Sequence, residues 1–396
     1  MGCRGSKQTI VEPTFDLKRK QSGKLYSLNN TISKQEESSQ SQDALAEGNG
    51  GGNETSTLNV KKARSKCNLY SSIIAASIKD QDRFITVPEL LPNIFFTGVF
   101  DGHGQNGAMF AERAATSFAQ LLRNKMTWMK EFNATNDITI DETLKNKATK
   151  EFTAVFEEIQ REFTSEYEKE VQKPLEKARK AMEKSEGIKL PMSLPMLGGT
   201  TATIIMVAGD LLFVAWVGDS RAVMCHVLTD SVTNVNSIQS IDLTVDHNIE
   251  SNEKERERAI KCGGAIAGRH IAVDDAEGML QVTRSLGDVP HHSNNIVSCI
   301  PEVNIFKLAT LEHPFVVLAS DGIWHHRSSN EVCQQMYEKM HGMVVESGGL
   351  DLTGDQLLAA CQDYEQTLID WVATNSAHVD DVVMSTFTVD GFNWGV

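Results

Sequence analysis

The stretch that most restricts the fold runs from Thr201 to Gly218 and is almost entirely apolar. Its length suggests a membrane-spanning helix, but Gly209 and Asp210 interrupt it near the middle. Its many β-branched residues favour strands over helix. The segment therefore predicts two neighbouring buried strands joined by a tight turn, and we expect no transmembrane helix.

Similar short apolar runs recur along the chain and predict further strands. The runs cover residues 73–76, 84–87, 95–100, 201–208, 211–217, 222–227, 315–319 and 382–389. Apolar residues recur on one helical face in residues 106–125 and 152–167, and later helices are expected at 331–340 and 356–374. The charged stretch 167–189 predicts a solvated helical extension. This order of elements predicts a layered α+β domain rather than alternating βαβ units.

Composition narrows the class of protein further. The chain has 396 residues, of which 40% are hydrophobic, enough for a sizeable core. Its net charge of −15 repels the phosphate backbone of nucleic acids, so we expect no nucleic-acid partner. The seven cysteines show no CxxC spacing, and an odd number indicates neither a disulfide framework nor a zinc site. A reducing, intracellular compartment fits this usage best.

The first residues match an acylation pattern. Gly2 follows the initiator methionine and Ser6 stands at the sixth position, which is typical of N-myristoylation, and Cys3 is a candidate for palmitoylation. Residues 1–26 carry six basic against two acidic residues, and such a leader favours an anionic membrane surface. Residues 27–57 are polar and glycine-rich, and predict a disordered tether before a domain at 58–396. We expect a cytoplasmic protein held at the inner face of a membrane.

Four aspartates each follow a strand-like apolar run and stand next to turn-forming residues. They are Asp82, Asp101, Asp321 and Asp380, and glycine follows Asp101 and Asp321. Each alone is explained by a simple turn. Together, carboxylates at the ends of neighbouring strands can converge on a hard cation such as Mg²⁺ or Mn²⁺.

A series of motifs containing these residues resembles the metal-dependent protein phosphatases, the type 2C serine/threonine phosphatases. In chain order the motifs are Val99-Phe100-Asp101-Gly102-His103-Gly104, Gly198-Gly199-Thr200-Thr201-Ala202, Val217-Gly218-Asp219-Ser220-Arg221-Ala222, Leu243-Thr244-Val245-Asp246-His247, Val282-Thr283-Arg284-Ser285-Leu286-Gly287-Asp288, Pro301-Glu302-Val303 and Ala319-Ser320-Asp321-Gly322-Ile323-Trp324, with Asp380 last. The resemblance covers residues 71–389, and several motifs in the family's order are far more specific than any one.

The resemblance implies a four-layer α-β-β-α sandwich, in which helices flank two antiparallel sheets and two divalent metals lie at one end. By resemblance, Asp101 bridges both metals and the Gly102 carbonyl binds one of them. Asp321 and Asp380 bind the other metal, and Asp82 belongs to a water-mediated shell. A water shared by two cations attacks phosphorus directly in such enzymes.

Further roles follow from the same resemblance. His103 is the general acid for the leaving serine or threonine oxygen. Asp219 is the candidate ligand of a third metal, with a plain turn between strands as the alternative. Arg221 and Arg284 are expected to pack and form salt bridges, while Asp246, His247 and Asp288 are expected at the edge of a substrate-side flap or as structural caps.

Three positions depart from the family pattern. His325 stands where relatives carry the third metal's aspartate, and imidazole shifts metal preference from Mg²⁺ toward Mn²⁺ or Zn²⁺, which counts against a third site here. Ser77 replaces a phosphate-binding arginine, and Lys79 or Arg83 is the expected substitute. Asp381 replaces an asparagine and is expected to add charge beside the metals.

Three functions remain open from the sequence. The leading one is a monomeric, membrane-tethered phosphatase acting on phosphoserine and phosphothreonine in proteins. The main alternative is a pseudophosphatase that acts as a membrane-tethered binding module, and the third is a hydrolase of small phosphomonoesters.

Overall fold

A computed structural model describes residues 25–27, 69–76, 79–132, 138–186, 194–229, 236–308, 311, 314–346, 363, 367 and 381–389. Gly2, Cys3 and Asp380 lie outside these ranges, as do nearly all of the predicted leader and tether and all but two residues of the helix expected at 356–374.

Two antiparallel sheets face each other at the centre of the molecule. The first has the order β14 (Glu302–Lys307), β8 (Leu211–Val217), β7 (Ala202–Ala208), β4 (Ile94–Phe100) and β3 (Arg83–Leu91). The second has the order β1 (Leu25–Ser27), β2 (Leu69–Ala76), β16 (Val382–Val389), β15 (Phe315–Ala319), β9 (Arg221–Thr229) and β10 (Asn236–Asp242). The predicted pair at 201–217 is β7 and β8, joined at Gly209 and Asp210.

The central strands are buried on both faces, which explains their unbroken apolar sequences. On β4, Phe95 and Val99 pack between the sheets, whereas Phe96 and Phe100 face the helices. Because successive strand residues point to opposite faces, both sets must be apolar. Phe95 meets Phe387 of the opposite sheet with ring centroids 5.1 Å apart.

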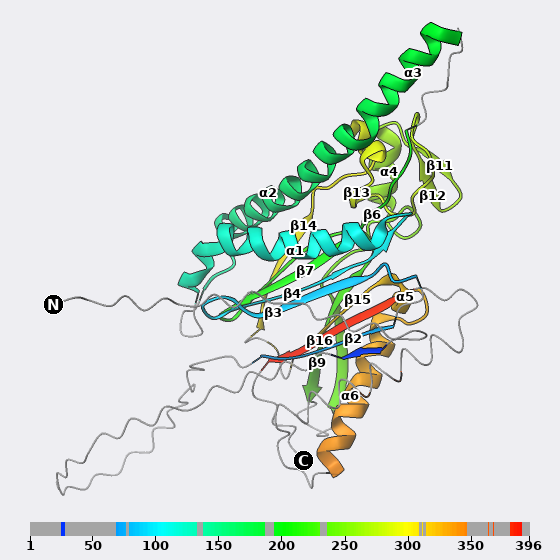
Figure 1. The fold of residues 1–396 in the computed structure, drawn as a ribbon. Coiled ribbons are helices and arrows are strands. Elements are labelled where there is room, and N and C mark those ends of the chain that lie inside the picture. The colour runs from blue at the N-terminus through cyan, green and yellow to red at the C-terminus, as the bar shows by residue number, and fades with distance from the viewer. Residues whose placement is uncertain are drawn as a thin grey trace, which may run out of the picture.

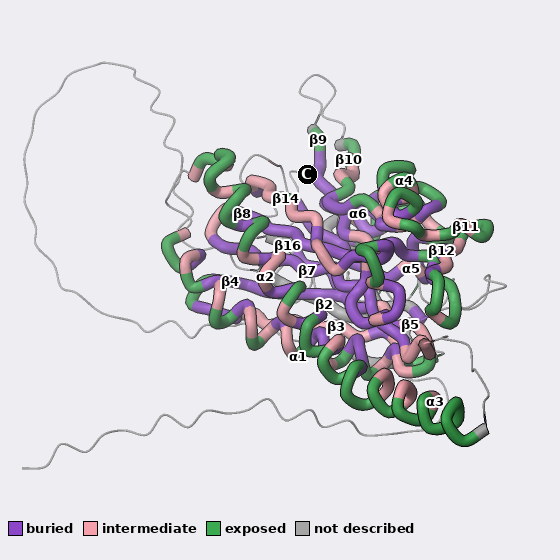
Figure 2. Tube along the Cα trace, turned by 90° about the horizontal axis from the view of Figure 1, so that it is seen from above, coloured by how far each residue is buried: buried purple, intermediate pink, exposed green. Residues whose placement is uncertain are grey.

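Helices cover the outer face of each sheet (Figure 1). On one side lie α1 (Gly107–Lys125) and α2 (Glu142–Tyr167), whose Phe118 and Phe156 rings are 4.7 Å apart. The opposite side carries α6 (Ser329–Glu346), which packs along β10. The predicted four-layer α-β-β-α sandwich is confirmed, and Figure 2 shows its buried strands at the centre.

The predicted charged extension is also helical. A π-helical turn, η2 (Glu168–Gln172), leads from α2 into α3 (Lys173–Glu186), which projects beyond the sheets (Figure 1). None of the residues in η2 is buried. In the described part of the chain no helix is long and apolar enough to cross a membrane.

Several elements were not predicted. The helix α4 (Glu253–Lys261) has almost no apolar residues, and begins where Asn252 Oδ1 accepts a hydrogen bond of 3.2 Å from the Glu255 N–H. It lies beside the short hairpin of β11 (Ala265–Ala267) and β12 (His270–Ala272). Nearer the amino end, Leu25–Ser27 pairs with β2. This strand was not predicted, because three residues are too few to produce a periodic pattern.

The expectation of no disulfide is wrong. Cys225 on β9 and Cys333 on α6 form a disulfide, although 108 residues separate them in sequence. Both cysteines are fully buried where the helix meets the sheet. Cys262 and Cys299 are free thiols, and the other three cysteines lie outside the described residues.

Candidate active site

Strand ends bring the predicted aspartates to one end of the sandwich. Arg83 at the start of β3 pairs with Phe100 at the end of β4, so Asp82 and Asp101 are neighbours. Ala319 at the end of β15 pairs with Arg221 at the start of β9, which places Asp321 beside the turn that carries Asp219. Asp380 immediately precedes β16 but lies outside the described residues.

Burial and neighbouring carboxylates strongly perturb the Asp82 carboxyl group. Asp82 is 8% exposed, and its Oδ2 is buried with no hydrogen-bond partner in the described part of the chain. Burial, then the charges of Asp381 and Asp321, raise the pKa of Asp82 to about 8, although interactions with Ser320 and Asp101 oppose the shift. A carboxyl held in this way is stabilised by a cation, because a positive charge nearby favours its ionised form.

The backbone around Asp101 is fixed by neighbouring hydroxyl groups. Its N–H donates to Thr201 Oγ1 at 3.1 Å, its carbonyl accepts from the Thr201 N–H at 2.9 Å, and Thr201 Oγ1 in turn contacts Ser220 Oγ at 2.8 Å. The next residue, Gly102, has no room for a side chain, because a Cβ there would collide with backbone atoms of Gln81 and Gly107. The loop that carries Asp101 is therefore held rigidly.

Asp219 lies in the turn between β8 and β9. Burial, followed by the charges of Asp321 and Asp246, raises the pKa of Asp219 well above its usual range, although His103 opposes this. The structure therefore places Asp219 within electrostatic reach of both Asp321 and His103.

His103 was expected to act as an acid, and its environment suits that role. Its Nε2 lies 2.7 Å from Oδ2 of Asp288, a residue that we expected only at a flap edge or as a cap. Burial favours the neutral ring, but Asp288 outweighs burial and raises the pKa of His103. The same pairing lowers the pKa of Asp288, whose burial alone would raise it.

Comparison with known proteins identifies the family. The sequence profile described as Protein phosphatase 2C matches residues 80–365. This chain belongs to the protein phosphatase 2C family.

Individual relatives agree with this assignment. "Probable protein phosphatase 2C 21" of Oryza sativa subsp. japonica is 30% identical over 153 residues, covering 37% of this chain and 40% of the relative. "Protein phosphatase 1K, mitochondrial" of Xenopus laevis is 29% identical over 257 residues, covering 64% of this chain and 55% of the relative. The match therefore spans about half the length of these relatives or less.

A solved structure has the same fold. The serine-threonine phosphatase 2C from Toxoplasma gondii superposes with a TM-score of 0.56 at 20% identity, covering 81% of this chain and 94% of that one. Protein phosphatase 2C enzymes are metal-dependent protein phosphatases.

The chemistry of these side chains bears on whether they can hold divalent metals. Among the described residues, which exclude Asp380, no three histidine, cysteine, aspartate or glutamate side chains form a ready-made metal site. The donor chemistry nevertheless fits, because Asp82 lies within electrostatic reach of Asp321 and Asp381, and its Oδ2 is buried with no hydrogen-bond partner among the described residues. Carboxylate oxygens are the ligands that Mg²⁺ and Mn²⁺ prefer. The ligand roles assigned to Asp101, Asp321 and Asp380 therefore stay predictions.

Two of the positions that bear on the family departures also hold the loop before Asp82. The Asp381 carboxylate accepts the N–H groups of Lys79 at 2.7 Å and Gln81 at 2.6 Å, so it clamps the loop before Asp82 as well as adding charge. Arg83 Nη1 donates to the carbonyls of Asp80 and Asp82 at 3.0 and 2.8 Å, which ties this guanidinium to the same loop.

Two further predictions concern single residues. His325 Nδ1 lies 3.3 Å from Oδ2 of Asp321, so it borders the site as its position implied. Arg221 holds Asp246 through two hydrogen bonds of 2.8 and 3.1 Å, which confirms its predicted structural role. Arg284 likewise contacts Glu255 at 2.6 Å.

Sequence reasoning missed Asp288 and Gln81 as parts of the site. Gln81 Nε2 donates to the Gly104 carbonyl at 2.6 Å, linking the Asp82 loop to the loop that carries His103. Asp288 lies 185 residues from His103. The motif that ends at Gly287-Asp288 was the available signal for Asp288, but only the fold reveals its partner.

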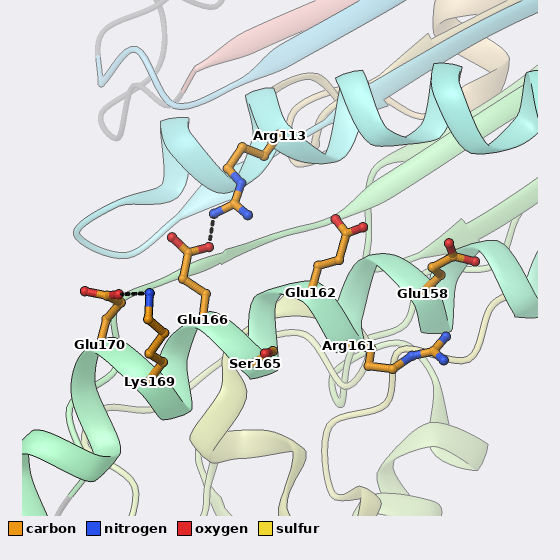
Figure 3. Close-up of a pocket in the computed structure, with 8 residues that line it drawn as sticks. All are labelled: Arg113, Glu158, Arg161, Glu162, Ser165, Glu166, Lys169 and Glu170. Carbon is orange, nitrogen blue, oxygen red and sulfur yellow. Dashed lines mark hydrogen bonds and ion pairs between the residues drawn. The ribbon is translucent and has the colours of Figure 1, made fainter.

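A separate hollow of about 770 Å³ lies between α1 and α2 (Figure 3), and its lining includes none of the aspartates described above. Its lining side chains are Arg113, Glu158, Arg161, Glu162, Ser165, Glu166, Lys169 and Glu170. Figure 3 shows Arg113 paired with Glu166 and Lys169 paired with Glu170. Because opposite charges here neutralise one another at the surface, this hollow lacks the concentrated charge of the aspartate end.

Proposed function

We propose that this chain removes phosphate from phosphoserine and phosphothreonine in proteins, in a reaction that depends on two divalent cations, Mg²⁺ or Mn²⁺. The observation that supports this most is the convergence of aspartates around Asp82, whose pKa rises to about 8 because burial and like charges oppose its ionisation. Such a site gains stability by binding cations. Family membership indicates protein phosphatase chemistry for that site.

The site residues divide into two tasks. Asp101, the Gly102 carbonyl, Asp321 and Asp380 would hold the cations, with Asp82 acting through water. When bound, the cations would lower the pKa of a shared water and offset charge on the phosphoryl oxygens. Asp219, with His325 beside Asp321, is the candidate for a third, weaker site.

His103 would carry the protein's own proton transfer. A serine or threonine alkoxide is a poor leaving group, so donation of a proton to its oxygen lowers the barrier. The raised pKa of His103 keeps the ring charged, and therefore able to donate, at higher pH than a free imidazole. Solvent then has to reprotonate the His103 ring before the next turnover.

The test is hydrolysis of phosphoserine and phosphothreonine peptides by the purified full-length chain, after chelation and with added Mn²⁺ or Mg²⁺. We expect metal-dependent release of phosphate, and at least a ~100-fold lower kcat in Asp101→Asn. Asp80→Asn is the matched control, since Asp80 is exposed and lies two residues before Asp82. Metal-stimulated activity no higher than that of Asp101→Asn would contradict the proposal and favour the pseudophosphatase. Preference for small phosphomonoesters over peptides would favour the third function.

We also propose that the chain is attached to a membrane through myristoylated Gly2 and palmitoylated Cys3, facing the cytoplasm. One acyl chain anchors only marginally, and the basic residues of 1–26 or the second chain would complete the anchor. Mass spectrometry of the native amino terminus tests this, with Gly2→Ala expected to move the protein to the soluble fraction. An unmodified or acetylated amino terminus would contradict it.

A further inference from the structure

His103 and Asp288 are joined by a small sheet that is separate from the two large ones. Its strands are β5 (Gly102–His103), β6 (Gly199–Thr200) and β13 (Leu286–Gly287), in the order β13-β6-β5. Gly199 in the middle strand is paired with His103 on one side and Gly287 on the other. This register places Asp288, directly after β13, across from His103.

Asp288 is buried and held from several directions. Its side chain is completely inaccessible, and its Oδ2 accepts a hydrogen bond of 2.6 Å from Ser285 Oγ in addition to the His103 contact. Its N–H donates to the Gly198 carbonyl at 2.9 Å. Its backbone takes the left-handed conformation, with φ 41° and ψ 39°, which is uncommon for a residue other than glycine.

The surroundings of Asp288 leave space for its carboxylate and little else. Gly199 lies directly against Oδ2, so any side chain at position 199 would displace the carboxylate. On the other side, the buried Gln160 of α2 brackets Gly287, donating to its carbonyl at 2.9 Å and accepting from its N–H at 2.8 Å. The position of the carboxylate is therefore fixed by contacts from β6 and α2 as well as its own turn.

The contact with Asp288 defines which ring nitrogen of His103 is available. An ionised carboxylate can only accept a hydrogen bond, so the imidazole must donate it and the hydrogen stays on Nε2. Among the described side chains, Asp288 is the hydrogen-bond partner of the ring. Nδ1 is then the nitrogen left to face substrate, and in the charged ring it carries the second, transferable proton.

We propose that Asp288 is a positioning residue that holds the His103 ring so that Nδ1 delivers the proton to the leaving oxygen. This inference rests on the proposed phosphatase function. In the step itself, the Nδ1–H bond breaks as the O–H bond of the released serine or threonine forms. The ring ends neutral with hydrogen on Nε2, still bonded to Asp288, so the pairing persists through the turnover.

A purely structural role for Asp288 would lead to a different result on substrates with different leaving groups. If Asp288 served only to hold its turn, its loss would weaken hydrolysis of every substrate alike. A residue that acts through the acid matters only where the leaving group needs a proton. p-Nitrophenolate leaves without protonation, whereas a serine alkoxide does not, so the two substrates separate the roles.

The experiment compares kcat of full-length wild type and Asp288→Asn on a phosphoserine peptide and on p-nitrophenyl phosphate, with Mn²⁺ present. We expect kcat on the peptide to fall about 10- to 100-fold with KM little changed, and kcat on p-nitrophenyl phosphate to stay within about 3-fold. In a His103→Ala background, the same substitution is expected to have no further effect on the peptide, because the two residues act as a unit. Equal losses on both substrates, or a further loss in the His103→Ala background, would overturn the inference.

Controls keep the result interpretable. Asp141→Ala removes the N-cap of α2, whose carboxylate accepts from the Leu144 N–H at 2.8 Å, and costs stability far from the site. This control should change kcat by the same factor on the phosphoserine peptide and on p-nitrophenyl phosphate. If Asp288→Asn does not fold, Ser285→Ala takes its place in the experiment. We expect its kcat to fall ~3- to 10-fold on the peptide and to stay unchanged on p-nitrophenyl phosphate. Equal changes of kcat on the two substrates would overturn the inference. An inactive wild type would instead contradict the proposed function itself.

Discussion

Two buried carboxylate groups in this molecule show opposite electrostatics. Glu255 on α4 is 3% exposed, yet hydrogen bonds and charges from Arg284 and Arg258 outweigh burial and lower its pKa to about 2. Asp82 is buried to a similar degree, but its charged neighbours are other carboxylates, and its pKa rises to about 8. Burial is common to both, so the sign of the shift depends on which charges the fold brings nearby.

The difference in neighbouring charges distinguishes a carboxylate with a structural role, Glu255, from one suited to a functional role, Asp82. Around Glu255, Thr283 Oγ1 adds a hydrogen bond of 2.8 Å, and Arg284 also reaches Glu302 at 3.3 Å, so the group is neutralised by the protein itself. It ties α4 to the segment that leads into β13 and Asp288. The Asp82 group is not neutralised in this way, which is costly for a purely structural site and useful for one that binds cations.

Removing the neutralised carboxylate should have the largest effect on stability. Glu255→Gln leaves Arg284 and Arg258 without their buried partner and is expected to lower the free energy of unfolding by about 3–5 kcal/mol. Urea denaturation at pH 7 measures this. The control Glu253→Gln lies on the same helix, where the Glu253 pair with Arg256 is exposed, and should cost less than about 1 kcal/mol. Equal effects of the two substitutions would contradict the comparison.

The two groups should also give opposite pH dependence. Asp82 keeps its proton in the folded state up to about pH 8 but loses it near 3.8 when unfolded, so stability falls as pH rises between these values. From pH 5 to 8 the loss reaches about 4 kcal/mol in the metal-free protein. For Glu255 the sign is reversed, and its stabilisation is lost as pH falls from 4.5 toward 2.

Asp82→Asn should therefore flatten the decline between pH 5 and 8, measured by urea unfolding in the presence of a chelator. The control Asp80→Asn should leave the decline unchanged, because Asp80 is exposed. Added Mn²⁺ is expected to flatten the wild-type decline as well. A wild-type curve no steeper than that of Asp82→Asn would show that Asp82 ionises normally.

A third substitution tests a link that belongs to neither carboxylate group. Replacing Cys225 and Cys333 with alanine removes a cross-link between β9 and α6 and should cost about 2–4 kcal/mol. The pH dependence of stability due to Asp82 and that due to Glu255 should both persist with their signs unchanged. Cys262→Ser, at a free thiol, is the control. A cross-link variant that also abolished the Asp82 pH dependence would mean that the two regions are coupled.

Much of the architecture could be predicted because it depends on local patterns. The apolar runs identified β4, β7, β8 and β15, and the 3.6-residue period identified α1 and most of α2. The positions of Asp101 and Asp321 at strand ends followed from the same runs. In contrast, α4 has no apolar face to reveal it, and the two residues of each strand in the small sheet are too short to show any period.

The unpredicted parts of the site all depend on contacts between distant segments. The Asp381 clamp on Lys79 and Gln81 spans about 300 residues, and the disulfide joins residues 108 apart. The His103–Asp288 pair could not be recognised because no sequence spacing connects β5 with β13. Motif resemblance predicted His103 as an acid, but not Asp288 as its hydrogen-bond partner.

The sequence by itself determined where the central strands lie, which faces are apolar, and that aspartates stand near the strand ends, because these properties depend on residues a few positions apart. Only the tertiary structure decided the state of those aspartates. Asp82 and Glu255 are both acidic side chains, and one is held protonated to about pH 8 while the other stays ionised to about pH 2. The cause is proximity, since Coulomb interactions and desolvation act between groups that folding alone brings together.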